Sequence, residues 1–264
     1  MIESRRRVAT EPAYVLHQYP YRNTSMLVEM VTQSYGRVAL IARGARSAKS
    51  RLQGVLQPFQ SLFVSWSGKG DLYTLVSAET SSGGSVLSGA GLMSGLYMNE
   101  LMLRLLHRHD PHASVFNIYQ ATIRLIAEAD RHYPGRDNRT TAMLWHERAL
   151  RLFEKALLSE LGYALNLGHD VESGEAILAD REYAYLPMRG PVLLENAAGT
   201  GVKISGRSLL AFKEDDLEDG IVMQETKRLM RTVIDSHLGG KPLNSRAMFA
   251  SMMAVCSEHT GCDS

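Results

Sequence analysis

Five cations fall within fifteen residues of the N-terminal third of the sequence, with no acidic residue among them. They are Arg37, Arg43, Arg46, Lys49 and Arg51. The last four lie in or beside a segment of Gly, Ser and Ala, where long cationic side chains and free backbone N–H groups can reach phosphate oxygens. This pattern predicts binding to a polyanion without sequence readout, and the alternative is a solvated basic loop.

The charge of the whole chain supports the same interpretation. The sequence carries 29 Lys and Arg against 28 Asp and Glu, so it is nearly neutral overall. Residues 1–79, however, hold ten of the cations and five of the acids, which leaves 19 cations and 23 acids in the remainder. A basic N-terminal module on a mildly acidic body indicates a polyanionic partner for the first part.

Aromatic residues on the neighbouring predicted strands offer two interpretations. Tyr35, Phe63, Trp66 and Tyr73 could supply stacking platforms beside the cations, as in oligonucleotide-binding barrels. They could equally be core residues, and for Trp66 and Phe63 core packing is the preferred prediction. Lys69, between two glycines at a predicted hairpin tip, would extend the basic track.

No catalytic site, metal site or cofactor is expected. The sequence has no phosphate-binding loop, no zincin motif and no nucleophile elbow. The cluster His107-Arg108-His109-Asp110-Pro111-His112 is rich in ligands, but Arg108 would repel a cation and a helix end explains the histidines. Cys256, His259 and Cys262 give three soft ligands where a closed zinc site needs four. A small-molecule enzyme is therefore not favoured.

The first 80 residues predict five short strands, at 13–18, 25–33, 37–43, 60–67 and 72–78. Apolar residues alternate along them, and tight-turn residues separate the second from the third and the fourth from the fifth. Five strands with one longer loop predict a small closed barrel, with a partly open sheet as the structural alternative. We therefore expect an α+β chain whose domain 1–80 is an OB-fold barrel.

The rest of the chain predicts helices. A small, polar linker at 81–91 is followed by helical periodicity at 92–107, 113–129, 143–161, 206–213, 224–238 and 244–253. We expect a helical domain over 92–254, an irregular insertion at about 166–200 with a hairpin from 183–188 and 191–195, and a frayed tail at 255–264. No run of 18 apolar residues and no secretory signal occur, so a cytoplasmic protein is expected.

Several segments resemble the bacterial RecO family of recombination mediators. The most specific are Gly44-Ala45-Arg46-Ser47, Leu56-Gln57-Pro58-Phe59, Gly95-Leu96-Tyr97-Met98-Asn99-Glu100-Leu101 and Leu238-Gly239-Gly240-Lys241-Pro242-Leu243 with Ser245-Arg246. They lie in collinear order over nearly the whole chain. The resemblance implies an OB-fold barrel on a helical body, association with the bacterial nucleoid, and no enzymatic activity.

The resemblance also implies partners and further site residues. Proteins of this family bind single- and double-stranded DNA, anneal complementary strands, contact the tail of single-strand-binding protein and, with RecR, promote RecA loading. It adds Lys241 and Arg246 to the candidate DNA-binding residues. For the acidic, aromatic-ended tail, Arg151 beside Leu150 and Phe153 is the candidate receptor, and the alternative is a surface arginine flanked by core residues. Some members hold zinc in the insertion, but Gly168–Tyr185 has no cysteine here, so no metal is expected.

A general RNA-binding or translation-associated OB-fold module is the alternative function. Annealing of strands coated by single-strand-binding protein would distinguish the two.

Overall fold

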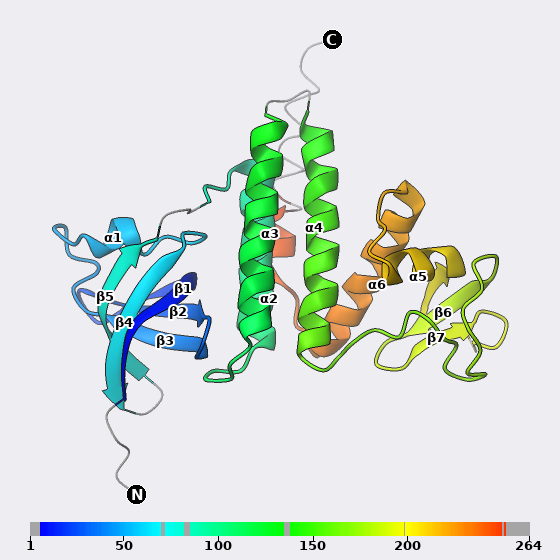
Figure 1. Cartoon of the computed structure of the whole chain (residues 1–264), viewed down its shortest axis with the longest axis horizontal. Helices are drawn as coiled ribbons and strands as arrows, with labels where there is room; N and C mark the ends of the chain where they lie inside the picture. The colour runs from blue at the N-terminus through cyan, green and yellow to red at the C-terminus, as the bar shows by residue number, and fades with distance from the viewer. Residues whose placement is uncertain are drawn as a thin grey trace, which may run out of the picture. The chain divides into compact units, whose positions relative to one another are not determined.

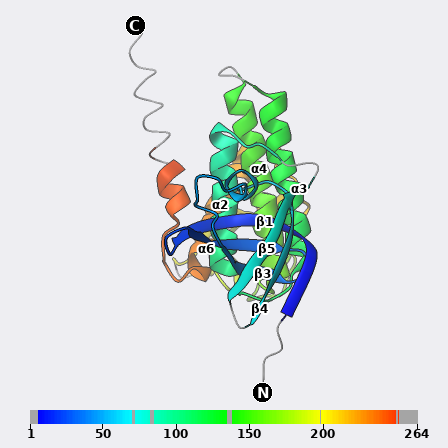
Figure 2. The ribbon, with the colours of Figure 1, turned by 90° about the vertical axis from the view of Figure 1, so that its left-hand side faces the viewer.

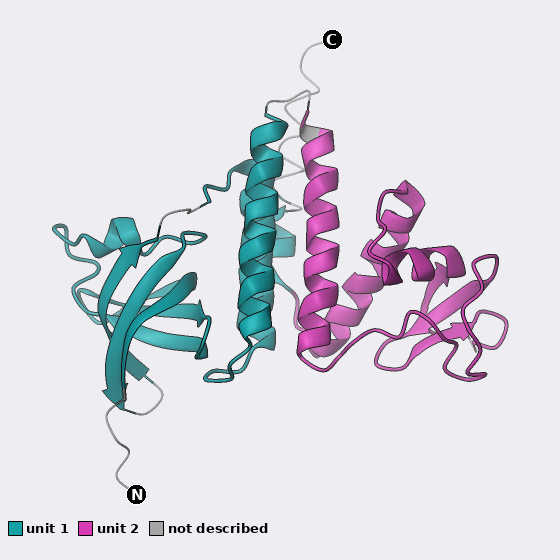
Figure 3. Ribbon diagram, viewed as in Figure 1, with its two compact units in different colours: residues 1–134, 243–264 teal, residues 135–242 magenta. Residues whose placement is uncertain are grey.

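The computed structural model describes residues 6–69, 72–81, 85–134, 138–197, 199–249 and 251. The chain forms two compact units, Met1–Pro134 with Leu243–Ser264, and Gly135–Pro242 (Figure 3). The expected linker 81–91 therefore lies within the first unit. The expected tail 255–264 lies outside the described residues.

The first unit begins with a closed barrel of five strands (Figures 1 and 2). The strands are β1 Arg6–Tyr21, β2 Ser25–Thr32, β3 Gly36–Ala42, β4 Leu62–Lys69 and β5 Leu72–Thr80. Their order is β1-β2-β3-β5-β4, with β1 also pairing with β4, and only β3 and β5 run parallel. This is the OB-fold arrangement, so the predicted barrel is confirmed.

Strand β1 closes the barrel because it is long enough to pair on both sides. Its first half, to Ala13, pairs with β4, and its second half, from Ala13, pairs with β2. Shifts in register between Val8 and Glu11, and between Val15 and His17, mark the bends. Pro12 and Pro20 each lie where β1 has a partner on one side only, so neither interrupts a two-sided ladder.

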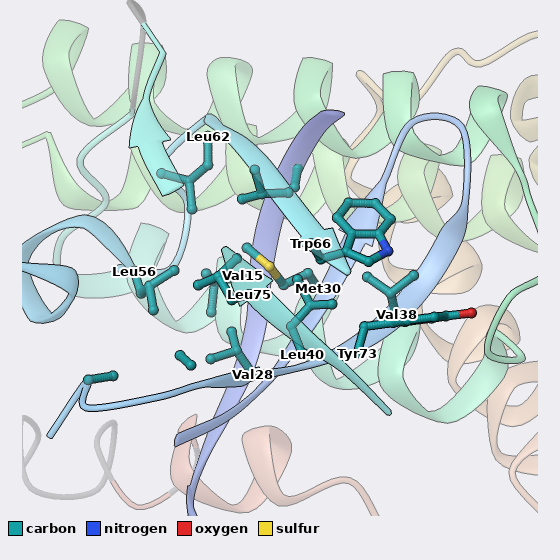
Figure 4. Close-up of a cluster of buried hydrophobic side chains, with 14 of the residues drawn as sticks. Val15, Val28, Met30, Val38, Leu40, Leu56, Leu62, Trp66, Tyr73 and Leu75 are labelled. Carbon is teal, nitrogen blue, oxygen red and sulfur yellow. The ribbon is translucent and has the colours of Figure 1, made fainter. Parts of the chain in front are cut away.

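The barrel interior is an apolar core (Figure 4). Alternate residues of each strand point inward, and the largest of them is Trp66. Leu56 follows the four-residue helix α1, Leu52–Val55, which the sequence did not predict, and it adds to this core. The labelled core residues are Val15, Val28, Met30, Val38, Leu40, Leu56, Leu62, Trp66, Tyr73 and Leu75.

Two helices of the same unit pack on the barrel, α2 Gly89–Leu105 and α3 Ala113–His132. Asn99 of α2 joins all three elements: its amide donates to Leu16 O at 3.0 Å, and its side-chain oxygen accepts from Tyr119 Oη at 2.7 Å. Burial, with the nearby Tyr14, raises the pKa of Tyr119 well above its ordinary value, so the phenol stays a donor.

The second unit combines helices with a small sheet. It contains α4 Arg139–Glu160, α5 Gly206–Lys213 and α6 Gly220–His237, and the sheet β7-β6-β8. The predicted hairpin is confirmed as β6 Glu182–Leu186 and β7 Gly190–Leu193, and β8 Val202–Ser205 is a third strand that the sequence did not reveal. Side chains of Ser205 and Asp219 cap the N-termini of α5 and α6.

Candidate nucleic-acid interface

The basic loop, residues 43–51, leaves the end of β3 and is fixed against the β1–β2 turn. Arg46 N donates to Thr24 O at 2.8 Å, and the Arg46 guanidinium lies 3.4 Å from Arg22 O. Gly44 supplies the positive φ of +68° that the turn needs. The turn between β1 and β2 and the basic loop therefore lie together at one end of the barrel.

Four predicted cations project into solvent without an acidic partner. Arg43, Lys49, Arg51 and Lys69 are exposed, and none of them forms an ion pair with any residue that the structure describes. Some exposed cations of the second unit differ, since Arg207 pairs with Asp219 at 2.7 Å and Lys203 with Glu182 at 3.5 Å. The barrel thus carries positive charge available to an external anion.

Arg43 and Lys69 line one hollow on the barrel surface. It has a volume of about 340 Å³, and Ser67, Gly68 and Thr74 complete its lining. The parallel pairing of β3 with β5 brings these residues together, because Ile41 lies opposite Thr74. Two cations with two hydroxyls in an open hollow suit a phosphate group.

Arg37 does not join this set. Its Nε donates to Glu29 Oε2 at 3.0 Å, and its Nη1 donates to the carbonyls of Leu103 and Leu106 at 2.5 and 3.1 Å. These carbonyls lie at the C-terminus of α2, where free acceptors attract a cation. In this arrangement Arg37 holds α2 to the barrel and has little freedom to meet a phosphate.

The predicted aromatic platforms are mostly internal. Trp66 and Tyr73 are buried in the barrel core, and Tyr35 packs edge-on against Trp66 at 5.2 Å between ring centroids. Phe63 was expected in the core, but its place on β4 opposite Pro12 leaves its side chain on the outer face and 41% exposed. Core packing therefore holds for Trp66 and not for Phe63.

Sequence reasoning missed a group of residues at the end of β1. His17, Tyr19 and Arg22 are exposed, and Tyr21 is partly exposed. The register shift after Val15 puts the aromatic residues of this group on the outer face. The alternation of His17, Tyr19 and Tyr21 in the sequence could have indicated one face of a strand. Pro20 lies between the two tyrosines, however, and proline argues against a strand.

Arg246 belongs to a short segment anchored on α2. Glu100 accepts from the backbone N–H groups of Asn244 and Ser245 at 2.9 and 2.8 Å, and from the Ser245 hydroxyl at 2.7 Å. Burial opposes ionisation of Glu100, but these hydrogen bonds and Arg104 outweigh it, so the pKa lies below its ordinary value. The Arg246 guanidinium lies 5.7 Å from the ring centroid of Tyr97.

Comparison with known proteins assigns both parts of the chain to one family. Residues 7–83 match the family described as recombination protein O N terminal, and residues 88–247 match recombination protein O C terminal. The DNA repair protein RecO of Nitrosospira multiformis is 40% identical over 245 residues, which cover 92% of this chain and 96% of the relative. The chain belongs to the RecO family.

Two further RecO relatives agree. The DNA repair protein RecO of Dechloromonas aromatica is 41% identical over 251 residues, covering 95% of this chain and 99% of its own. The DNA repair protein RecO of Coxiella burnetii is 42% identical over 243 residues, which cover 92% of this chain and 98% of the relative. The similarity extends over barrel and helices alike, so this is a DNA repair protein family with an OB-fold domain.

In this RecO-family chain, the residues expected to receive an acidic peptide tail lie mostly inside the protein. Arg151 is only 8% exposed and pairs with the buried Glu154 one turn along α4, while Phe153 is fully buried. The same helix exposes Leu144 and Trp145, and the partly exposed Arg148 pairs with Glu218 at 3.5 Å and lies 5.9 Å from the Trp145 ring centroid. Lys241 is exposed beyond α6, after two glycines with positive φ.

The insertion of this RecO-family chain is organised by a carboxylate. Asp170 accepts from the N–H groups of Glu172, Ser173 and Leu193 at 2.8, 3.0 and 2.7 Å. Burial opposes its ionisation, but these bonds outweigh it, and the pKa of Asp170 lies below its ordinary value.

Neither metal ligands nor a membrane helix stand out in the described ranges. No three His, Cys, Asp or Glu residues gather there as a metal site would require. The candidate ligands Cys256, His259 and Cys262 lie outside those ranges. No described helix combines the length and apolar character needed to cross a bilayer.

Proposed function

We propose that this protein is a RecO-type recombination mediator that binds single- and double-stranded DNA on its barrel and anneals complementary strands, with no catalytic role of its own. One observation carries the proposal. Five exposed cations lie on the barrel and its basic loop, and in the described part of the chain no acid pairs with them. They are Arg43, Arg46, Lys49, Arg51 and Lys69.

Such a surface suits annealing because it reads no sequence. Contacts to phosphate position a strand and carry no information about its bases, so any complementary pair is accepted. Counterion release supplies the free energy and makes binding fall steeply with salt. Neutralising phosphates on both strands also reduces their mutual repulsion as they pair.

Arg37, Lys241 and Arg246 have different places in this proposal. Arg37 acts indirectly, by holding α2 on β3. Lys241 is exposed after α6 and is proposed to make a weaker phosphate contact. Arg246 would have to move away from the Tyr97 ring to contact a phosphate. Variants of the five barrel cations should therefore weaken DNA binding more than variants of these three.

We further propose that the helical domain receives the acidic, aromatic-ended tail of single-strand-binding protein. Leu144, Arg148 and Arg151 share one face of α4 at spacings of four and three. Arg148 pairs with the exposed Glu218 and can exchange that carboxylate for one of the tail. Trp145 and Leu144 offer apolar surface for the aromatic end of the tail. Arg151 on that face is buried and paired with Glu154, and Leu150 and Phe153 lie on other sides of the helix. We also propose that the protein acts with RecR to promote the loading of RecA onto DNA.

Annealing of complementary oligonucleotides, naked and coated with single-strand-binding protein, tests this function. The wild type should accelerate annealing of both substrates. Arg43→Ala/Arg46→Ala should lose activity on naked strands, whereas Arg148→Ala should lose it only on coated strands. A wild type that accelerates neither would refute the proposal, and activity on naked RNA strands alone would favour the general RNA-binding alternative.

A further inference from the structure

We propose that His17, Tyr19 and Tyr21, the β1 aromatic strip, form a stacking platform for unpaired nucleobases. This inference rests on the proposed DNA binding and deepens it. It predicts that residues outside the basic loop give the protein a preference for single-stranded over paired DNA.

The register of β1 puts the strip on one outer face. His17, Tyr19 and Tyr21 lie opposite Glu29, Leu27 and Ser25 of β2, whereas Gln18 lies opposite the core residue Val28. Residues paired across a ladder share a face, so the three rings point away from the core. Tyr19 is 45% exposed, which leaves much of its ring open to a ligand.

Local contacts hold the rings in place. The His17 and Tyr19 ring centroids are 4.4 Å apart with their planes tilted by 60°, and the Arg22 guanidinium lies 5.3 Å from the Tyr21 centroid. A ring already supported on one side loses little freedom when a base stacks on it. The strip is therefore preorganised rather than a set of freely rotating side chains.

The surroundings of the strip select an anionic, flat ligand. Leu27 pairs with Ile41 of β3, and both are partly exposed, so the apolar surface continues across three strands. Beyond it lie Arg22, Arg43 and Arg46, which have no acidic partner among the described residues. The acid on the same face, Glu29, is buried and paired with Arg37 and Arg108. Aromatic rings beside unpaired cations suit bases and phosphates of one strand.

The platform explains how one surface can distinguish two forms of DNA. Phosphates are present in single and double strands alike, so the cations bind both. In a duplex each base is already stacked and paired, whereas the bases of a single strand are free to lie on an aromatic ring. We therefore expect the strip to add affinity for single strands alone.

The test compares an oligonucleotide of thymidines with an abasic strand of the same length, which keeps the phosphates and lacks the bases. Tyr19→Ala should weaken binding to the thymidine strand about tenfold, within the range for one base on one ring. It should leave binding to the abasic strand and to a duplex unchanged. Tyr19→Phe should retain wild-type binding to all three.

Phe63→Ala is the matched control, since it removes another exposed aromatic of the barrel. Phe63 lies on β4 opposite Pro12, which is seven residues before Tyr19 along β1, a separation of at most about 23 Å for an extended strand. The Phe63→Ala variant should bind all three substrates as tightly as the wild type does. Tyr19→Trp adds a direct readout, since its fluorescence should be quenched by the thymidine strand and not by the abasic one.

The outcomes distinguish a failure of the stacking platform from a failure of the proposed DNA binding. If Tyr19→Ala binds the thymidine strand as tightly as wild type, or loses the same factor on the abasic strand, the stacking platform is refuted while DNA binding stands. If the wild type binds none of the three substrates, the proposed function itself fails.

Discussion

Arg37 Nε donates to Glu29 Oε2 at 3.0 Å, and this carboxylate is only 2% exposed. Arg108, which follows α2, pairs with the other oxygen of the same carboxylate. The pair connects two neighbouring barrel strands, and the Arg37 guanidinium continues to the last carbonyls of α2. A cation predicted to meet DNA is thus part of the joint between barrel and helices.

Arg37→Ala should destabilise the protein without directly removing a DNA contact. It leaves a buried carboxylate with one cation instead of two and uncaps α2, which we expect to cost about 2–4 kcal/mol. Urea unfolding followed by circular dichroism measures this loss. Arg43→Ala is the control and should change the free energy of unfolding by less than about 0.5 kcal/mol. Equal stability of the two variants would contradict the assignment.

The barrel cations should appear in the salt dependence of DNA binding. Removing one cation that neutralises a phosphate should reduce the slope of log K against log salt concentration by about 0.7 for a single strand. We therefore expect a shallower slope for Lys69→Ala and for Arg43→Ala. Titration of a labelled thymidine oligonucleotide from low to moderate salt measures it. A weaker variant with an unchanged slope would mean that the side chain does not meet phosphate.

Asp170 should make the stability of the second unit depend on pH in the acid range. Because the folded-state pKa lies below the ordinary value of 3.8, its contribution is full above that value and is lost as pH falls through the lower folded pKa. Asp170→Ala should cost about 2–4 kcal/mol at pH 7, since three N–H groups lose their acceptor. Chemical denaturation below pH 4 should show a smaller fall in the free energy of unfolding for this variant than for the wild type. If the fall is the same in both, other carboxylates cause it.

Glu100 should control the docking of the segment that carries Arg246. Glu100→Gln retains size but removes the charge that accepts from Asn244 and Ser245, so the amides of 244–249 should exchange hydrogen roughly tenfold faster. Hydrogen exchange followed by mass spectrometry resolves this segment. Glu128→Gln, an exposed change on α3, should leave the exchange unaffected. Protection that survives in Glu100→Gln would show that packing alone holds the segment.

Local patterns in the sequence were sufficient to predict most of the barrel. The alternation in 25–33 and 37–43 around Ser34-Tyr35-Gly36 gave the β2–β3 hairpin, and Gly36 there has φ +64°. Strand β1 was predicted too short because Pro12 and Pro20 argue against a strand. Only the tertiary pairing shows that each proline has a partner strand on one side alone.

The site was predictable where it depends on loops and not where it depends on distant contacts. Arg43, Lys49 and Arg51 lie in a segment whose composition marks an exposed loop, and they are exposed. Arg37 has the same charge, but its carbonyl partners are 66 and 69 residues away in sequence. Arg151 was chosen for its apolar neighbours in sequence, but it is buried and paired with Glu154 on the same helix.

Equilibrium binding of a single-stranded oligonucleotide at low salt tests the central claim most directly, with two charge-matched double variants. Arg43→Ala/Lys69→Ala removes two cations without acidic partners, and Lys203→Ala/Arg207→Ala removes two cations that are paired within the second unit. The account predicts at least tenfold weaker binding for the first variant and wild-type binding for the second. Equal losses in both variants, or none in the first, would contradict a DNA-binding surface on the barrel.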